Sequence, residues 1–216
     1  MNRSITRRHF HCLGLAAAAP AWLPRAAQAQ GGPVEGKHFV RLSQPVAPAA
    51  AGKVEVVEFF WYGCPHCFSL EPFVEQWLAK LPADVAFRRV PAAFTPQYEF
   101  HQKVFYAFEA LGLLGSLHRK FFNAIHVDRK RLVTEADVAA FVSANGADGA
   151  KVADAMKSFS VIGKARQAKQ LSDAYGVDSV PMLGVQGRFR TSAAMAGGVD
   201  KAFLVVDHLV ELARKG

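Results

Sequence analysis

The chain has 216 residues, of which 51% are hydrophobic and 20% are charged, so it can build one sizeable core and is not disordered over most of its length. Its formal net charge is +8, from 26 Lys and Arg against 18 Asp and Glu. Four of the cations, all arginines, lie in residues 1–29, which contain no acid, so the remaining chain carries only +4. The basic balance is therefore weak evidence for a nucleic-acid partner or a membrane surface.

Residues 1–29 predict a cleaved signal peptide. Residues 1–12 carry cations, residues 13–23 are mostly Leu, Ala and Gly, and Ala27-Gln28-Ala29 has the small-x-small form of a cleavage site. The apolar stretch is too short to span a bilayer. The alternative is an amphipathic N-terminal helix. We expect a soluble mature protein that begins at Gln30 and works in the periplasm, where disulfides persist.

The export route stays open at this point. Thr6-Arg7-Arg8-His9-Phe10 resembles a twin-arginine signal, but it also fits an ordinary positively charged leader. Cys12 does not follow the Leu-Ala-Gly type of run that precedes a lipid-modified cysteine, so no lipid anchor is expected.

The first half of the mature chain alternates strand and helix patterns. Residues 40–42 predict a short strand, and the β-branched and aromatic run 54–61 predicts a buried one. Apolar residues at helical spacing then predict a helix to about residue 81, kinked early by Pro72. Residues 85–90 predict the next strand.

The second half begins with a long helical block, from about residue 97 to 176. Thr134 and Asp137 have the spacing of a capping box. Gln186-Gly187 separates two short apolar runs and predicts a β-hairpin. Asp200 is expected to cap a final helix that ends near Arg214.

Signal-peptide cleavage removes Cys12 and leaves two cysteines, in Cys64-Pro65-His66-Cys67. A disulfide across two intervening residues closes a very short loop, so it constrains the unfolded chain less than a long-range bridge would. A structural role explains this pair poorly, and a reactive role explains it better.

The position of the pair, between a strand end and a helix start, predicts its chemistry. Unpaired backbone N–H groups and the positive end of the helix dipole favour a thiolate there. We expect Cys64 to be the exposed nucleophile with a lowered pKa, and Cys67 to be more buried. Pro65 suits the first helical position, and His66 can add positive charge or be a solvated turn residue.

At these residues the chain resembles a known family. Phe59-Phe60-Trp61-Tyr62-Gly63-Cys64-Pro65-His66-Cys67 is similar to the active-site strand and turn of the DsbA family of periplasmic dithiol oxidases. The resemblance extends over residues 37–214. It continues through Glu71-Pro72, the segment Gly176 to Pro181 and the segment Ala193 to Gly198.

The resemblance implies an α/β fold, a thioredoxin-like mixed sheet with an inserted helical domain. Residues 37–96 and 164–214 would form the thioredoxin-like domain, and residues 97–163 the insertion.

The resemblance also implies further site residues. Glu58 would be a proton relay beneath the cysteines, unless it faces solvent at a sheet edge. The family often places a lysine on the next strand as its partner, but this chain offers Arg88 and Arg89. Val180 and Pro181 would bind substrate beside Cys64 through a cis peptide bond, where the alternative is an ordinary trans proline. The histidines outside the motif show no cluster spacing and are expected at helix surfaces or in packing; they are His101, His118, His126 and His208.

The function that follows is a monomeric thiol:disulfide oxidoreductase that donates its Cys64–Cys67 disulfide to newly exported, thiol-containing proteins. It would be reoxidised by a DsbB-type membrane quinone reductase, and it would need no cofactor. One alternative is a disulfide isomerase or reductase, which the residue Val180 and the lack of a dimerisation domain disfavour. The other is a metal-binding chaperone that uses Cys64, His66 and Cys67.

Overall fold

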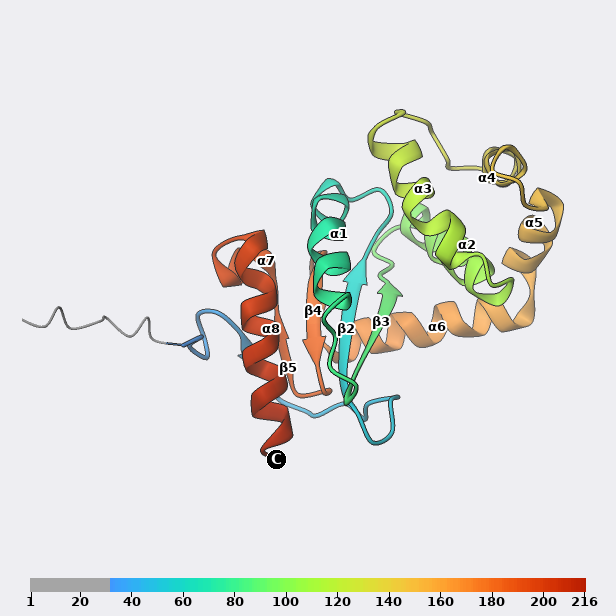
Figure 1. Cartoon of the computed structure of the whole chain (residues 1–216). Helices are drawn as coiled ribbons and strands as arrows, with labels where there is room; N and C mark the ends of the chain where they lie inside the picture. Colours follow the sequence, from blue (N-terminus) through green and yellow to red (C-terminus); the bar gives the residue numbers. More distant parts are fainter. Residues whose placement is uncertain (1–31) are drawn as a thin grey trace, which may run out of the picture. The chain divides into compact units, whose positions relative to one another are not determined.

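A five-stranded mixed sheet lies at the centre of residues 32–216, the part of the chain that the computed structural model describes (Figure 1). The strands are β1 (Val40–Arg41), β2 (Val54–Phe60), β3 (Val85–Pro91), β4 (Met182–Val185) and β5 (Phe189–Thr191). Their order is β1-β5-β4-β2-β3, and only β2 and β3 run parallel. This confirms the α/β class and the mixed sheet. The predicted signal peptide, its cleavage site and Cys12 lie outside the described residues.

The helices fall into two groups along the chain. One group flanks the sheet and consists of α1 (Pro65–Leu78), α7 (Ala193–Ala196) and α8 (Val199–Arg214). The other connects β3 to β4 and consists of α2 (Pro96–Ala110), α3 (Leu114–His126), α4 (Glu135–Ala144), α5 (Gly149–Lys157) and α6 (Phe159–Ala174). No helix within residues 32–216 is both long and apolar enough to cross a bilayer.

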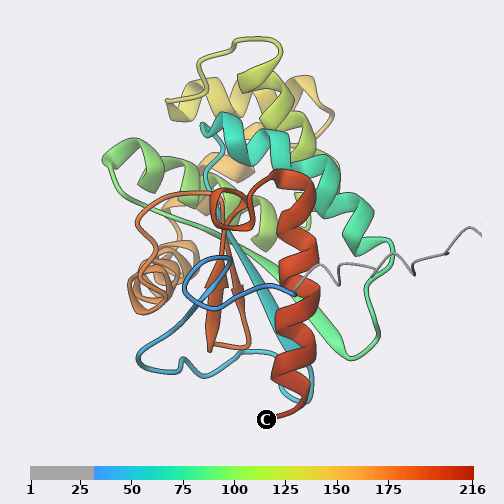
Figure 2. The same cartoon turned by 90° about the vertical axis from the view of Figure 1, so that its left-hand side faces the viewer.

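The two faces of the sheet bury separate apolar clusters, because successive side chains of a strand point to opposite faces. From β2, Val54 and Val56 pack with residues of α1 and α8, whereas Val57 and Phe59 pack with the helical block. Figure 2 shows α8 on one side of the sheet and α6 on the other. All seven residues of β2 are buried, as its β-branched and aromatic composition predicted.

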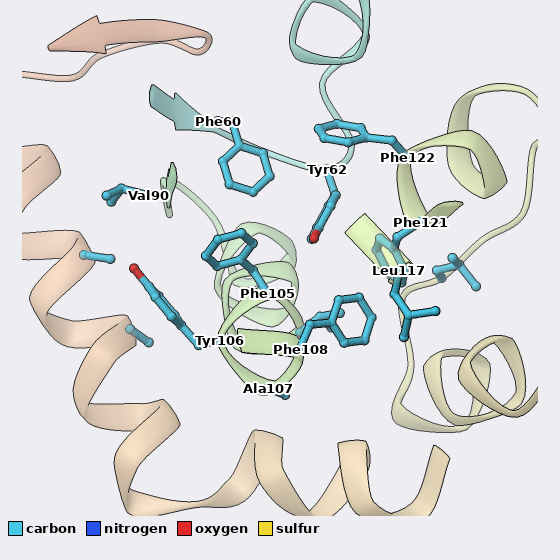
Figure 3. Close-up of a cluster of buried hydrophobic side chains, with 14 of the residues drawn as sticks. Phe60, Tyr62, Val90, Phe105, Tyr106, Ala107, Phe108, Leu117, Phe121 and Phe122 are labelled. Carbon is cyan, nitrogen blue, oxygen red and sulfur yellow. The ribbon is translucent and has the colours of Figure 1, made fainter. Parts of the chain in front are cut away.

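The end of β2 is also where the helical block meets the sheet. Phe60 and Tyr62 lie among the aromatic rings of α2 and α3, which include Phe105, Phe121 and Phe122 (Figure 3). Tyr62 is 1% exposed. Aromatic packing therefore anchors the loop that precedes the cysteine pair to helices far away in the sequence.

Three details differ from the sequence-based expectations. Helix α1 ends at Leu78 rather than near residue 81, because Leu81 precedes Pro82, which disfavours helical backbone at that position. Gly198, not Asp200, is the N-cap of α8, and Asp200 lies in the first turn. Helix α6 runs without interruption across the predicted domain boundary at residue 163, and the division into two domains stays a prediction.

Candidate active site

The cysteine pair begins helix α1. Cys64 is the N-cap, with extended backbone (φ −86°, ψ 116°), and Pro65 occupies the first helical position, as predicted. The backbone N–H of Cys67 donates to Cys64 Sγ at 3.3 Å. The thiol of Cys64 therefore takes the place that a Ser or Asp side chain fills in an ordinary helix cap, where a negative charge is favoured.

Both thiols are free, and their environments move their pKa values apart. A hydrogen bond from the Cys67 side chain is the largest cause that lowers the pKa of Cys64 to about 6; burial opposes it, and the backbone N–H groups of Cys67 and His66 add to it. The charge of His66 also lowers this pKa. Burial raises the pKa of Cys67 far above its usual range, with further contributions from Cys64.

Cys64 is less accessible than the sequence suggested. It retains 7% of its surface, whereas Pro65 and His66 are exposed and Cys67 is fully buried. The segment just before β4 covers part of Cys64, because Cys64 Sγ lies 3.4 Å from the carbonyl oxygen of Val180. Solvent therefore reaches only a small part of the Cys64 surface.

The Val180–Pro181 peptide bond is cis, as predicted. Both residues line a groove of about 520 Å³ that runs from His66 on α1 to the start of α8. Apolar and small side chains dominate its lining, which includes Leu70, Ser179, Ala193, Gly197 and Val199. The groove adjoins the cysteine pair through Val180, since the carbonyl oxygen of this lining residue lies 3.4 Å from Cys64 Sγ.

Glu58 is completely buried on β2 and has the cationic partner that the sequence left in doubt. The parallel register places Arg89 of β3 directly beside it, and Arg89 Nε donates to Glu58 Oε2 at 3.1 Å. The other carboxylate oxygen, Oε1, has no hydrogen-bond partner among the described residues. Burial is the largest cause that raises the pKa of Glu58 to about 8, and Arg89 opposes it.

Sequence reasoning missed a buried polar network around this pair. Arg89 also binds Glu71 of α1 at 3.0 Å, and Glu71 lies 3.4 Å from the ring of His118, which in turn lies 2.8 Å from the hydroxyl of Tyr62. His118 is only 7% exposed and packs among aromatic rings, as one of the two expected placements allowed, but its hydrogen bonds to Glu71 and Tyr62 were not predicted. A signal existed, since Glu71 is a charged residue at a core position of α1.

Two other histidines of the helical block form hydrogen bonds to backbone carbonyl groups of loops. His126 Nε2 lies 2.8 Å from the carbonyl oxygen of Tyr62, and its ring stacks on Phe68 of α1. His101 lies 2.8 Å from the carbonyl of Leu132. These contacts join elements that are distant in sequence, and no local pattern marks them. Over the described range 32–216 there is no group of three or more His, Cys, Asp or Glu side chains arranged to hold a metal ion.

Comparison with known proteins places this chain in a family. A DSBA-like thioredoxin domain model matches residues 75–210. The thiol:disulfide interchange protein DsbA of Pseudomonas aeruginosa is 41% identical over 179 residues, covering 83% of this chain and 85% of that protein. The protein of the same name from Burkholderia cepacia is 42% identical over 201 residues, with 92% of each chain covered. The crystal structure of Pseudomonas aeruginosa DsbA superimposes with a TM-score of 0.81 at 40% identity, over 84% of this chain and 95% of that one.

Proposed function

The chain belongs to the DsbA family of thiol:disulfide interchange proteins, and we propose that Cys64 and Cys67 carry the disulfide that it exchanges. The protein is a thiol:disulfide oxidoreductase that acts on thiol-containing proteins as a dithiol oxidase. The observation that carries the assignment of the pair is the position of Cys64 at the helix N-cap beside Cys67. There a hydrogen bond from the Cys67 side chain, followed by the backbone N–H groups of Cys67 and His66, lowers the pKa of the Cys64 thiol to about 6.

The first step is attack by a substrate thiolate on Cys64 Sγ of the oxidised protein. A bond forms between the substrate sulfur and Cys64, the Cys64–Cys67 bond breaks, and Cys67 leaves with the electron pair as a thiolate. Because burial raises the pKa of Cys67 so strongly, this thiolate takes up a proton. Glu58, with a pKa of about 8, holds a proton at neutral pH and is the acid that supplies it.

The second step releases the product. A second substrate thiolate attacks the substrate sulfur of the mixed disulfide, and Cys64 leaves as a thiolate. A leaving thiol with a low pKa departs faster, and at neutral pH Cys64 needs no proton. Because the Cys64 thiolate is stabilised in the reduced protein, the equilibrium favours an oxidised substrate and a reduced Cys64–Cys67 pair.

Substrate docking would use the groove beside Cys64. The backbone of Val180, next to the reactive sulfur, would pair with an extended substrate chain in the manner of an added strand. Pro181 has no N–H that would compete for these bonds. The mainly apolar lining of the groove suits unfolded chains of varied sequence, because it makes contact without requiring particular polar partners.

The N-terminal sequence and the thiol chemistry together indicate the cellular compartment and the partners of the protein. The residues before Gln30 would direct export to the periplasm, where newly exported proteins with free thiols are the substrates. A DsbB-type membrane quinone reductase would reoxidise the pair, and the protein would act as a monomer.

Oxidation of a synthetic peptide with two cysteines tests the proposal. The oxidised protein should convert about one equivalent of peptide per molecule, and Cys64→Ser should convert none. Cys67→Ser, mixed with the disulfide form of the same peptide, should instead accumulate peptide adducts: the Cys64 thiolate attacks the peptide disulfide, one peptide sulfur leaves as a thiolate, and no neighbouring thiol of the protein releases Cys64. Peptide adducts on Cys67 in Cys64→Ser, with none on Cys64 in Cys67→Ser, would refute these roles of the two cysteines. Metal in the aerobically purified protein, together with free thiols, would favour the metal-binding alternative.

A further inference from the structure

Two buried carboxylates share one guanidinium beneath the cysteine pair. Arg89 donates through Nε to Glu58 Oε2 at 3.1 Å, and through a terminal nitrogen to both oxygens of Glu71 at 3.0 and 3.2 Å. Glu58 is 0% and Glu71 1% exposed. Among residues 32–216, Arg89 is the only arginine or lysine that forms an ion pair with either acid. One positive charge cannot compensate two buried negative ones, so the pair keeps one proton.

His118 contacts only one of these acids. Its Nε2 lies 3.4 Å from Glu71 Oε1, and its Nδ1 lies 2.8 Å from the hydroxyl of Tyr62. Burial lowers the pKa of His118, so the ring is neutral and carries a single N–H. An ionised carboxylate only accepts hydrogen bonds, so Nε2 carries the hydrogen and donates to Glu71. Nδ1 is then the acceptor, and the Tyr62 hydroxyl donates to it.

The hydrogen bonds on the two acids are unequal as a result. Glu71 accepts two bonds from Arg89 and one from His118, whereas Glu58 accepts one bond and its Oε1 is unpartnered. Hydrogen bonds to the charged form of a carboxyl group favour that form. We propose that His118 is a positioning residue, which keeps Glu71 ionised and thereby leaves the shared proton on Glu58.

The charges around the two acids agree with this assignment. Burial raises the pKa of Glu71, but the hydrogen bond from His118 and the charge of Arg89 outweigh it and lower that pKa. The negative charge of Glu71 in turn helps to raise the pKa of Glu58, as does Cys64.

The inference rests on the proposed role of Glu58 as the acid that protonates Cys67. Helix α3 would then control the proton of Glu58 through Glu71 of α1, although no hydrogen bond or ion pair joins α3 to Glu58 among residues 32–216. Tyr62, in the loop before Cys64, would hold the His118 ring in the required tautomer.

Carboxyl ¹³C NMR of the reduced full chain, labelled at glutamate, tests the proposal. The Glu58 and Glu71 signals are assigned by their loss in Glu58→Gln and Glu71→Gln. His118→Phe keeps the edge-on ring contacts with Phe60 and Phe122 but has no N–H to donate. In this variant the Glu58 midpoint should fall from about 8 by about 1 to 3 pH units, and the Glu71 midpoint should rise. His118→Gln, whose amide can donate, should restore most of the Glu58 midpoint.

Two further measurements make the test specific. His101→Phe removes another buried imidazole of the helical block and should leave the Glu58 midpoint unchanged. In the unmodified protein, ¹⁵N NMR should find His118 neutral at pH 7 with the hydrogen on Nε2, a result that does not depend on any variant folding. A hydrogen on Nδ1, or a folded His118→Phe with the Glu58 midpoint of the unmodified protein, would overturn the proposal. These NMR measurements do not depend on disulfide exchange. A normal rate of disulfide exchange in Glu58→Gln would therefore refute the role of Glu58 as the acid that protonates Cys67, but not the proposal for His118.

Discussion

The lowered pKa of Cys64 is caused by groups within one helical turn of it. The thiol and the backbone N–H of Cys67 and the backbone N–H of His66 all stabilise the Cys64 thiolate, and the side chain of Cys67 does so most. The exposed His66 imidazole acts through its charge, in contact with water, where charges are strongly screened. The relative effects of Cys67 and His66 on the pKa of Cys64 can be measured.

We expect Cys67→Ala to raise the pKa of Cys64 above about 6 by more than His66→Ala does, and by about 1 unit or more. Cys67→Ala removes the hydrogen-bond donor with the largest effect, whereas His66→Ala removes only a screened charge. The thiolate absorbance of the reduced protein, followed against pH, gives both values. A larger shift in His66→Ala would show that charge, rather than hydrogen bonding, controls the thiolate. A midpoint at or above about 7.5 in the unmodified protein would contradict an oxidase altogether.

Glu58 imposes a pH dependence on stability with a definite sign. Its pKa is about 8 in the folded protein and 4.5 in its ordinary state, so the folded form binds the proton more tightly. The stabilisation is complete below about pH 4.5 and is lost as the pH rises towards 8. As the pH rises from about 4.5 to 8, the unfolding free energy of Glu58→Gln should therefore increase relative to that of the unmodified reduced protein. Denaturant titrations at several pH values measure it, and a difference that does not change with pH would contradict a raised pKa.

The same substitution should slow the first exchange step at neutral pH. Without the acid, the buried Cys67 thiolate must take its proton from water, and general acids typically contribute on the order of 10² or more to a rate. Stopped-flow reduction of the oxidised protein by a thiol peptide measures the loss. Glu55→Gln is the matched control, because Glu55 is equally buried on β2 but pairs with Arg88. Equal rates for both variants would remove Glu58 from the mechanism.

At the scale of elements, the loop from β2 to α1 is held by the helical block. The indole of Trp61 stacks on Tyr98 of α2 at 3.9 Å between ring centroids, and the same ring lies close to Gly63. His126 of α3 holds the carbonyl of Tyr62. The loop that presents Cys64 is thus clamped by side chains from α2 and α3, and its shape depends on a glycine.

Gly63→Ala should break this clamp. A Cβ at Gly63 would lie 2.3 Å from the Trp61 ring, so the indole must leave its stack on Tyr98. We expect a loss of stability of about 1 to 3 kcal/mol, as for other overpacked sites, together with a change in tryptophan fluorescence. Gly163→Ala is the control. A Cβ at that position of α6 meets nothing within 4 Å, and alanine there should stabilise the helix by about 0.5 to 1 kcal/mol. Unaltered fluorescence and stability in Gly63→Ala would show that the loop is not clamped.

At the scale of the whole molecule, the thiolate couples redox state to folding. Folding lowers the pKa of Cys64 from 9.0 to about 6, so the reduced protein gains stability that is complete above about pH 9 and is lost as the pH falls through 6. The oxidised protein has no such thiolate, and its disulfide spans only two residues and stabilises little through loop closure. Reduction should therefore stabilise this protein.

The expected result is a higher denaturant midpoint for the reduced form than for the oxidised form at pH 7 to 9. The advantage should grow between pH 6 and 9 at up to about 1.4 kcal/mol per unit. Cys64→Ser, which has neither the disulfide nor the Cys64 thiolate, should lack this rise. An oxidised form that outlasts the reduced one over this pH range would show that the pair is a structural bridge.

The order of strands and helices and the family could both be predicted from the sequence, because each depends on local patterns. A run of β-branched and aromatic residues marks β2, helical spacing marks α1, and the two cysteines three residues apart at their junction mark the proposed site. The cis bond before Pro181 and the capping box at Thr134 were also predicted correctly.

Only the tertiary structure decided which groups share the buried region under the cysteines. The parallel register of β2 and β3 gives Glu58 the partner Arg89, and the packing of α3 against α1 brings His118 to Glu71. The tertiary structure also determines that Cys64 is almost completely buried, because the carbonyl group that lies against its sulfur belongs to Val180, 116 residues further along the chain. Such contacts have no local signature. They depend on how the sheet and the helical block pack, and the same residue types at the same spacings would fit a surface position equally well.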